Sequence, residues 1–168
     1  MARLERILIA VNRALVAAAL AAVFLIVITN VVGRYLFGSS LAWGEEVARF
    51  LMIFGVFAGA GLALRSGRLV EIDLFVALLP RGLKTAIRWG AVVVMAVFMG
   101  LIFWFGLRFV EFGWNKETMA TGISRGIPYM AIPFGCFLFL CHLAFVCRRF
   151  VSGEFEPEAA LDDQEDPS

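Results

Sequence analysis

Charged residues and histidine are scarce in this chain, and their scarcity excludes several kinds of site. Charged residues make up 17% of the 168 residues, against roughly a quarter in soluble domains. A single histidine, His142, cannot form a bis-histidine haem site. Cys136, Cys141 and Cys147 follow neither a C-x-x-C nor a zinc-binding spacing. We therefore expect no metal, no cofactor and no catalytic residue, with the cysteines as small apolar fillers of a helix and His142 in a structural hydrogen bond.

Basic residues interleaved with aromatic residues, the pattern of a nucleic-acid groove, are also missing, so no nucleic-acid partner is expected. Charge is instead divided along the chain. All 15 Lys and Arg precede Gly153, whereas seven of the 14 acidic residues follow it. Because residues 153–168 combine this acidity with almost no apolar side chains, we predict that they form a disordered cytoplasmic tail.

Apolar residues, by contrast, are abundant: 61% of the chain is hydrophobic and the mean hydropathy is +0.87. A helix of about 20 apolar residues crosses the hydrocarbon core of a membrane, and lipid requires the backbone to be helical. The predicted fold is an all-α integral membrane protein, in which residues 1–152 form a domain of four transmembrane helices. The spans are expected at about residues 12–33, 43–64, 89–108 and 127–148.

The second of these spans includes charged residues at its start. Only 15 residues separate Arg49 from Arg65, which is about 22 Å of helix and too short to cross. The helix must therefore begin near Trp43 and include Glu45, Glu46 and Arg49 in its first turns. Their i,i+3 and i,i+4 spacing lets the two acids pair with Arg49. We interpret them as a self-neutralising cluster at the membrane interface; the alternative is a polar contact with a partner or with lipid head groups.

The orientation follows from the counts of Lys and Arg on the two sides. With the amino terminus inside, ten lie on the inner side and five on the outer side, so both termini are expected in the cytoplasm. Residues 68–80, between the second and third spans, are apolar but too few to cross. We predict an amphipathic helix along the cytoplasmic interface there; a partly buried loop is the alternative.

Small residues form a surface on the second span. Gly55 and Gly59 make a GxxxG pair, and Gly61 extends it. Such a surface lets another helix approach closely, and that helix belongs either to a partner or to this chain. In the last span, Pro128 is expected in the first turn, and Pro133 is expected to kink the helix.

The interiors of the expected spans contain no Asp, Glu, Lys or Arg. Ion coupling inside a membrane typically relies on such side chains, and active transporters usually show internal repeats and broken helices around a midplane site. The residues therefore predict a scaffold, and not an enzyme.

Several short segments follow one another along the chain: Arg34, then Trp43 to Arg49, Ala63 to Gly67, Val70-Glu71-Ile72-Asp73 with Leu79-Pro80, and Gly126-Ile127-Pro128 followed by Ala131-Ile132-Pro133. Taken in this order, they resemble the small membrane subunit of TRAP transporters, the DctQ type. The resemblance covers roughly residues 12–150. One departure is Leu69, where family members often carry a histidine.

The resemblance implies partners and a function. Such subunits lie in the bacterial inner membrane and pair with a large DctM-type membrane subunit, which performs sodium-driven uptake of an organic acid. A periplasmic substrate-binding protein delivers the substrate, and the small subunit braces the transport subunit and helps to dock the binding protein. Candidate contacts with these partners or with membrane lipids are Arg34, Trp43, Glu45, Glu46, Arg49, Gly55, Gly59, Gly61, Arg65 and Asp73.

Two other functions stay open at this point. One is an independent small transporter or channel that assembles from several copies through Gly55 and Gly59. The other is a membrane thiol oxidoreductase, which would need accessible paired cysteines outside the bilayer, whereas all three cysteines fall in the last span.

Overall fold

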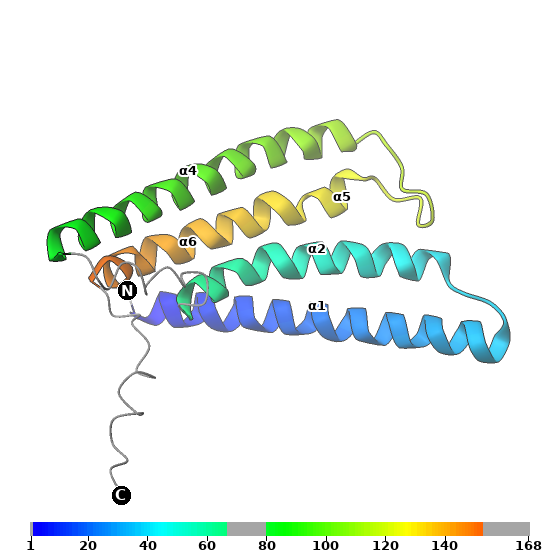
Figure 1. Cartoon of the computed structure of the whole chain (residues 1–168). Coiled ribbons are helices and arrows are strands. Elements are labelled where there is room, and N and C mark those ends of the chain that lie inside the picture. Colours follow the sequence, from blue (N-terminus) through cyan, green and yellow to red (C-terminus); the bar gives the residue numbers. More distant parts are fainter. Residues whose placement is uncertain (1, 67–79, 153–168) are drawn as a thin grey trace, which may run out of the picture.

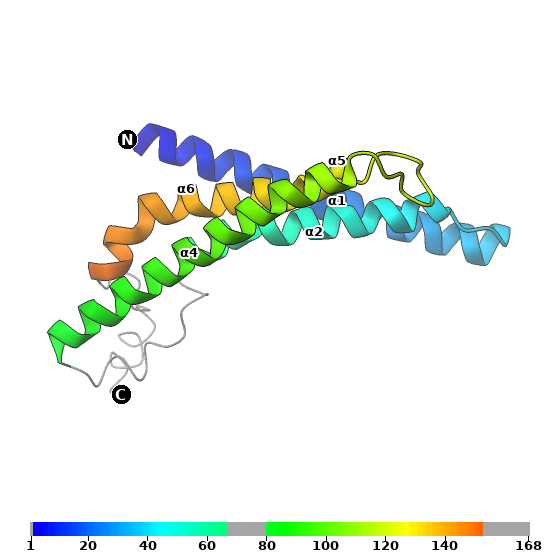
Figure 2. The ribbon, with the colours of Figure 1, turned by 90° about the horizontal axis from the view of Figure 1, so that it is seen from above.

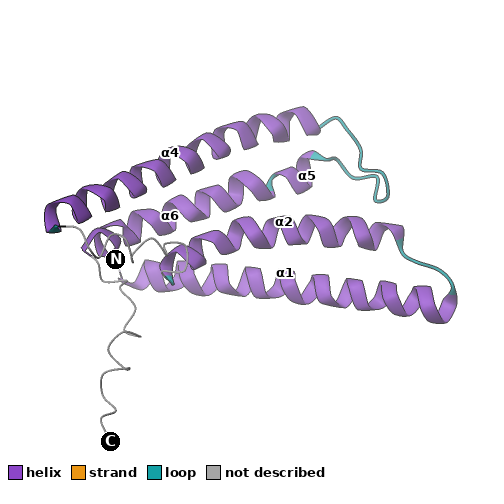
Figure 3. Ribbon diagram, in the orientation of Figure 1, coloured by secondary structure: helices purple, strands orange, loops and turns teal. Residues whose placement is uncertain are grey.

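The computed structural model describes residues 2–66 and 80–152, which are helices joined by loops (Figure 3). Within these ranges there is no strand beyond one isolated bridge between Glu117 and Ser124, and the predicted all-α class is confirmed. The helices are α1 (Ala2–Phe37), α2 (Ala42–Arg65), α4 (Arg81–Gly113), α5 (Gly126–Tyr129) and α6 (Ala131–Ser152).

Four stretches of helix are long and apolar enough to cross a membrane, which confirms the predicted number of spans. They are longer than the expected ones: α1 alone has 36 residues, about 54 Å at 1.5 Å per residue, whereas the hydrocarbon core is about 30 Å thick. The four stretches are Arg3–Phe37, Ala42–Arg65, Gly82–Gly113 and Gly126–Ser152.

The helices lie side by side in a row, in the order α1, α2, α6 and α4 (Figure 1). The main interfaces are accordingly α1 with α2, α2 with α6, and α6 with α4. Seen from above, the row is twisted, since α1 and α4 run in different directions (Figure 2). Along the helix axes the bundle has two ends. The start of α1 and the end of α6 lie at one of them, called here the terminal end. The connection from α1 to α2 and the loop 114–125 lie at the other, called the loop end.

Helix α6 is the most enclosed of the four, because it lies between α2 and α4. Half of its most apolar stretch is buried, against 11% for α1 and for α4. The buried core contains Leu64 of α2, Val92 of α4 and, from α6, Phe139, Leu143, Val146 and Phe150. The apolar side chains that remain exposed on α1 and α4 are those that lipid or another membrane protein must cover.

A proline interrupts the last span. Helical structure stops at Met130, between α5 and α6. Pro133 has no N–H to donate to the carbonyl of residue 129, so the i to i−4 ladder loses a bond there. Pro128 lies in the first turn of the span, within α5, as predicted. Pro133 lies within the first turn of α6, and the kink expected there stays a prediction.

Three predictions lie outside the described residues. The interfacial helix expected at 68–80 falls there except for Pro80, as does Asp73, and so does the acidic tail 153–168.

Candidate functional site

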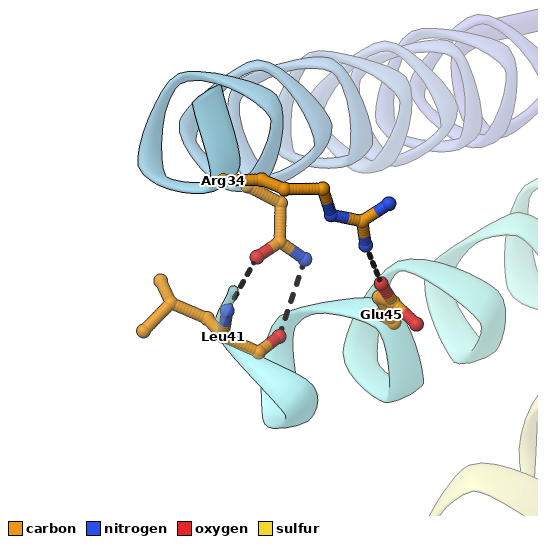
Figure 4. A network of polar contacts seen from close by, with 4 residues as sticks. Arg34, Leu41 and Glu45 are labelled. Carbon is orange, nitrogen blue, oxygen red and sulfur yellow. Dashed lines mark hydrogen bonds and ion pairs between the residues drawn. The ribbon is translucent and has the colours of Figure 1, made fainter. Parts of the chain in front are cut away.

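The connection between α1 and α2 holds two of the predicted residues together. Gly38, with φ of 65°, ends α1 in the left-handed conformation that glycine allows. Asn30 holds the connection near the start of α2. Its side chain accepts a hydrogen bond from the Leu41 amide at 2.6 Å and donates one to the Leu41 carbonyl at 3.2 Å. Arg34 then reaches Glu45 across the connection, with Nη2 2.8 Å from Oε1 (Figure 4).

Glu46 holds the loop between α4 and α5. Its Oε2 accepts hydrogen bonds from the amides of Ala120 and Thr121, at 3.1 and 2.8 Å, and from the Thr121 hydroxyl at 3.0 Å. The loop is further ordered by the Thr118 amide, which donates to the Ile123 carbonyl at 2.8 Å. Three donors on one carboxylate oxygen couple the start of α2 to a loop more than 70 residues away in sequence.

The predicted pairing of Glu45 and Glu46 with Arg49 is wrong. Within the described residues, Glu45 pairs with Arg34 and Glu46 binds the loop, and no ion pair links either acid to Arg49. Arg34 of α1 takes the place of Arg49 as the partner of Glu45, and three donors of the loop converge on Glu46. Arg49 is exposed and lines a polar pocket of about 390 Å³ together with Arg125, Glu45, Glu46 and the loop.

The terminal end contains a polar network that joins α1, α2 and α6. Arg65 donates from Nε to Nδ1 of His142 at 2.7 Å and from Nη1 to Glu5 at 2.6 Å. The amide of Asn12 lies 2.9 Å from Nε2 of His142 and 3.0 Å from the Ala58 carbonyl. Asn12 and His142 are 1% and 0% exposed. The prediction that His142 makes structural hydrogen bonds is confirmed.

The bonds around His142 determine where its proton lies. A guanidinium can only donate, so Nδ1 accepts from Arg65 and the ring proton lies on Nε2. The amide of Asn12 therefore faces two partners with opposite needs, the Nε2–H of His142 and the carbonyl oxygen of Ala58. One orientation of the amide serves the carbonyl, and the opposite orientation serves the ring.

Small residues allow α2 and α6 to approach closely beside this network. A methyl group added at Gly61 would lie 2.5 Å from Cδ2 of His142 and 3.3 Å from the Cα of Phe139. One added at Gly135 would collide with Phe57. Gly61 and Arg65 thus make their contacts inside the chain, and Gly135 is a close-packing residue that the sequence analysis did not single out.

The GxxxG pair behaves differently. A methyl group at Gly59 would meet only Val16 of α1, at 3.9 Å, and one at Gly55 would meet no atom within 4 Å. Neither glycine is needed for a close approach within the described residues. Trp43, the remaining predicted residue, is 47% exposed at the start of α2.

An apolar groove of about 720 Å³ runs between α2 and α4, and residues of α5 and α6 form its floor. Val47, Phe50, Leu51 and Phe54 form its α2 wall. Phe50 and Pro128 line both this groove and the polar pocket that contains Arg49, so the two spaces adjoin. The opposite wall consists of Phe103, Leu107 and Val110 of α4, and Pro133, Phe134 and Phe137 lie on α6.

Within the described ranges, no three His, Cys, Asp or Glu side chains come together as a metal site would require. The cysteines are free thiols, with Cys136 buried and Cys141 and Cys147 partly buried in α6. What these residues do together is hold helices and a loop in place. Sequence reasoning missed Glu5, Asn12 and Asn30, although isolated polar residues in or beside an apolar helix are themselves a signal for interhelical hydrogen bonds.

Comparison with known proteins adds the family. Residues 23–152 match the family described as "Tripartite ATP-independent periplasmic transporters, DctQ component". The chain is 33% identical to the ectoine TRAP transporter small permease protein TeaB of Halomonas elongata, over 64% of this chain and 57% of that relative. It thus spans less than two thirds of that relative's length.

Two further relatives are named for sialic acid. The small permease protein SiaQ of Vibrio cholerae is 26% identical over 69% of this chain and 68% of its own length. The permease protein SiaT of Haemophilus influenzae is 28% identical over 67% of this chain but only 18% of its own length. Together with the four apolar helices, these matches identify a multi-pass protein of the inner membrane. The chain belongs to the family of the DctQ component of tripartite ATP-independent periplasmic transporters.

Proposed function

We propose that this chain is the small membrane subunit of a tripartite TRAP transporter and acts as a fixed scaffold for a large membrane subunit. One observation carries the proposal. Residues 14–33, 50–64, 89–107 and 126–147 contain no Asp, Glu, Lys or Arg, and the enclosed Arg65 is held by Glu5 and His142. An ion or substrate site would need such groups free, whereas a scaffold needs them paired.

The partner in this proposal is a second, larger membrane protein. The match to a segment of the much longer SiaT supports it, because a DctQ-like segment there forms part of one long permease chain. The exposed features that could contact the partner or lipid lie on α1 and α2: the Arg34–Glu45 ion pair, Trp43 and the open surface at Gly55. Gly59, Glu46 and Arg49 border the same surfaces.

The transport reaction in the proposal is sodium-driven uptake of an organic acid, delivered by a periplasmic binding protein that the small subunit helps to dock. The two relatives named for sialic acid support the substrate class. The excess of Lys and Arg on one side supports cytoplasmic termini, which would place the loop 114–125 on the periplasmic side.

Flux measurements in proteoliposomes test the proposal. We expect no saturable uptake with this chain alone, with or without a sodium gradient. Uptake should appear when the large subunit and the binding protein encoded with it are both added, and it should require sodium. Specific, saturable flux through this chain alone would contradict the scaffold function and favour an independent transporter.

Co-purification tests the contact surface. Gly55→Leu should weaken the complex with the large subunit, because a bulky side chain prevents close helix approach. Gly55→Ala, which meets no atom within 4 Å, serves as the matched control. Thermal unfolding of both variants alone shows whether a loss of complex reflects misfolding.

A further inference from the structure

We propose that the apolar groove and the adjoining polar pocket together bind one phospholipid of the surrounding bilayer, with an acyl chain in the groove and the phosphate at Arg49. The inference goes beyond the transporter proposal and does not depend on it, since it needs only that the chain lies in a membrane. It rests on the shape of the groove, the residues that line it and the charge at its mouth.

The groove and the pocket form an amphipathic pair of spaces. The groove has a volume of about 720 Å³ and is lined almost entirely by apolar side chains, while the pocket of about 390 Å³ is lined by charged and polar side chains mixed with apolar ones. They meet at Phe50 and Pro128, which line both. The pocket lies at the loop end, where the helices emerge from their apolar stretches. A phospholipid has the same sequence of an apolar part followed by a charged part.

The lining of the groove favours an acyl chain over a helix. Helix interfaces in membranes are enriched in Gly, Ala, Ser and Thr, which let two backbones approach. Among the described residues that line this groove, only Ala131 belongs to that group. The walls consist instead of large side chains such as Phe54, Phe103 and Phe134, and a thin flexible chain can pack between these where a helix cannot come close.

The pocket holds two acids and two arginines, and of these four Arg49 is the one that makes no hydrogen bond or ion pair within the described residues. Of the two acids there, Glu45 pairs with Arg34 at 2.8 Å, and Glu46 accepts three hydrogen bonds from the loop. Arg125 donates its Nε to the Glu117 carbonyl at 2.8 Å. Arg49 is exposed and forms no ion pair within the described residues. A guanidinium with its donors free at a membrane interface matches the phosphate of a lipid in charge and geometry.

Native mass spectrometry of the full chain in detergent tests the site with two probes: palmitoyl-oleoyl phosphatidylglycerol and the diacylglycerol with the same chains but no phosphate. We expect the chain to retain phosphatidylglycerol more strongly. Arg49→Gln should lower that affinity about fivefold, the factor for one basic residue at an anionic surface. Arg49→Lys should largely restore it. Arg108→Gln is the matched control, because Arg108 is an exposed arginine near the loop end that lines neither space.

Two results would overturn the charged part of the site: equal retention of the two probes, or an equal loss with Arg49→Gln and Arg108→Gln. Circular dichroism of each variant guards against loss of fold.

Photocrosslinking in nanodiscs tests the apolar part. Phosphatidylglycerol with a diazirine on its acyl chain should label the groove walls around residues 50–54 and 134–137 above the level on the outer surface of α1, and Ala131→Trp, which fills the groove, should reduce that labelling. Labelling spread over all exposed helices would overturn the proposal. So would complete protection of the groove when the large subunit is co-expressed, because a protein would then be its occupant.

Discussion

The two ends of the helical row each contain an arginine–glutamate pair of nearly the same length, but in different surroundings. At the terminal end Arg65 and Glu5 are 2.6 Å apart, with side chains 12% and 27% exposed. At the loop end Arg34 and Glu45 are 2.8 Å apart and 60% and 56% exposed. Water can replace either partner of the exposed pair, whereas the enclosed pair depends on the groups around it. The distance between the two charged groups therefore does not by itself determine how much an ion pair contributes to the free energy of unfolding.

The largest effect is expected from removing the enclosed arginine. Arg65→Ala leaves Glu5 without its partner and His142 without its donor, and breaking such a pair costs about 3 kcal/mol. Arg34→Ala should lower the free energy of unfolding by only about 0.5 kcal/mol. Unfolding of the detergent-solubilised chain, followed by circular dichroism, measures both. Equal losses from the two variants would show that burial does not distinguish the pairs.

The next effect concerns two glycines of the same helix. Gly61→Ala places a methyl group 2.5 Å from the ring of His142, and overpacking of this kind costs about 1–3 kcal/mol. Gly55→Ala fills open space and should leave stability unchanged or slightly higher. The comparison uses the same unfolding measurement. A destabilised Gly55→Ala variant beside a stable Gly61→Ala variant would contradict the packing described here.

A local effect is expected at the loop end. Glu46→Gln removes the negative charge that binds the amides of Ala120 and Thr121, so these amides should exchange with deuterium faster, while global stability changes little. Glu45→Gln is the control, since Glu45 contacts Arg34 and not the loop. Hydrogen exchange with mass spectrometry resolves the loop. If both variants speed exchange there equally, Glu46 has no special part in ordering it.

The smallest effect on stability is expected at Arg49. Because it forms no ion pair within the described residues, Arg49→Ala should change the free energy of unfolding by less than about 0.5 kcal/mol in detergent without added lipid. If Arg49→Ala lowered the free energy of unfolding as much as Arg65→Ala does, that result would support the predicted pairing of Arg49 with Glu45 and Glu46. Unfolding of Arg49→Ala, measured beside Arg65→Ala and Arg34→Ala, decides this.

The helices could be predicted because lipid imposes a simple rule on the sequence. Uncharged stretches near 20 residues, bounded by arginines such as Arg13 and Arg34, have no alternative in a membrane but to be helical. The helix ends could not be predicted equally well. Hydropathy reports where lipid lies, while the backbone continues as helix through polar residues, so α1 begins at Ala2 and ends at Phe37.

The pairing of side chains was harder, because it depends on which helices touch. The spacing within α2 predicted Arg49 as the partner of Glu45. The connection from Phe37 to Ala42 is so short, however, that the chain turns back and places Glu45 beside Arg34. That signal is present in the sequence, since residues close to either side of a short turn become neighbours. The partners of Glu46 and His142 give no such signal, because loop 118–121 and Asn12 are separated from them by 72 or more residues.

The four long helices form a single layer, and this layer has two broad faces. A lipid or protein on one broad face of the layer reaches the other face only around the outer helices, α1 or α4. A protein that covers one face leaves the other in contact with lipid, so the same chain can present each neighbour with a different surface.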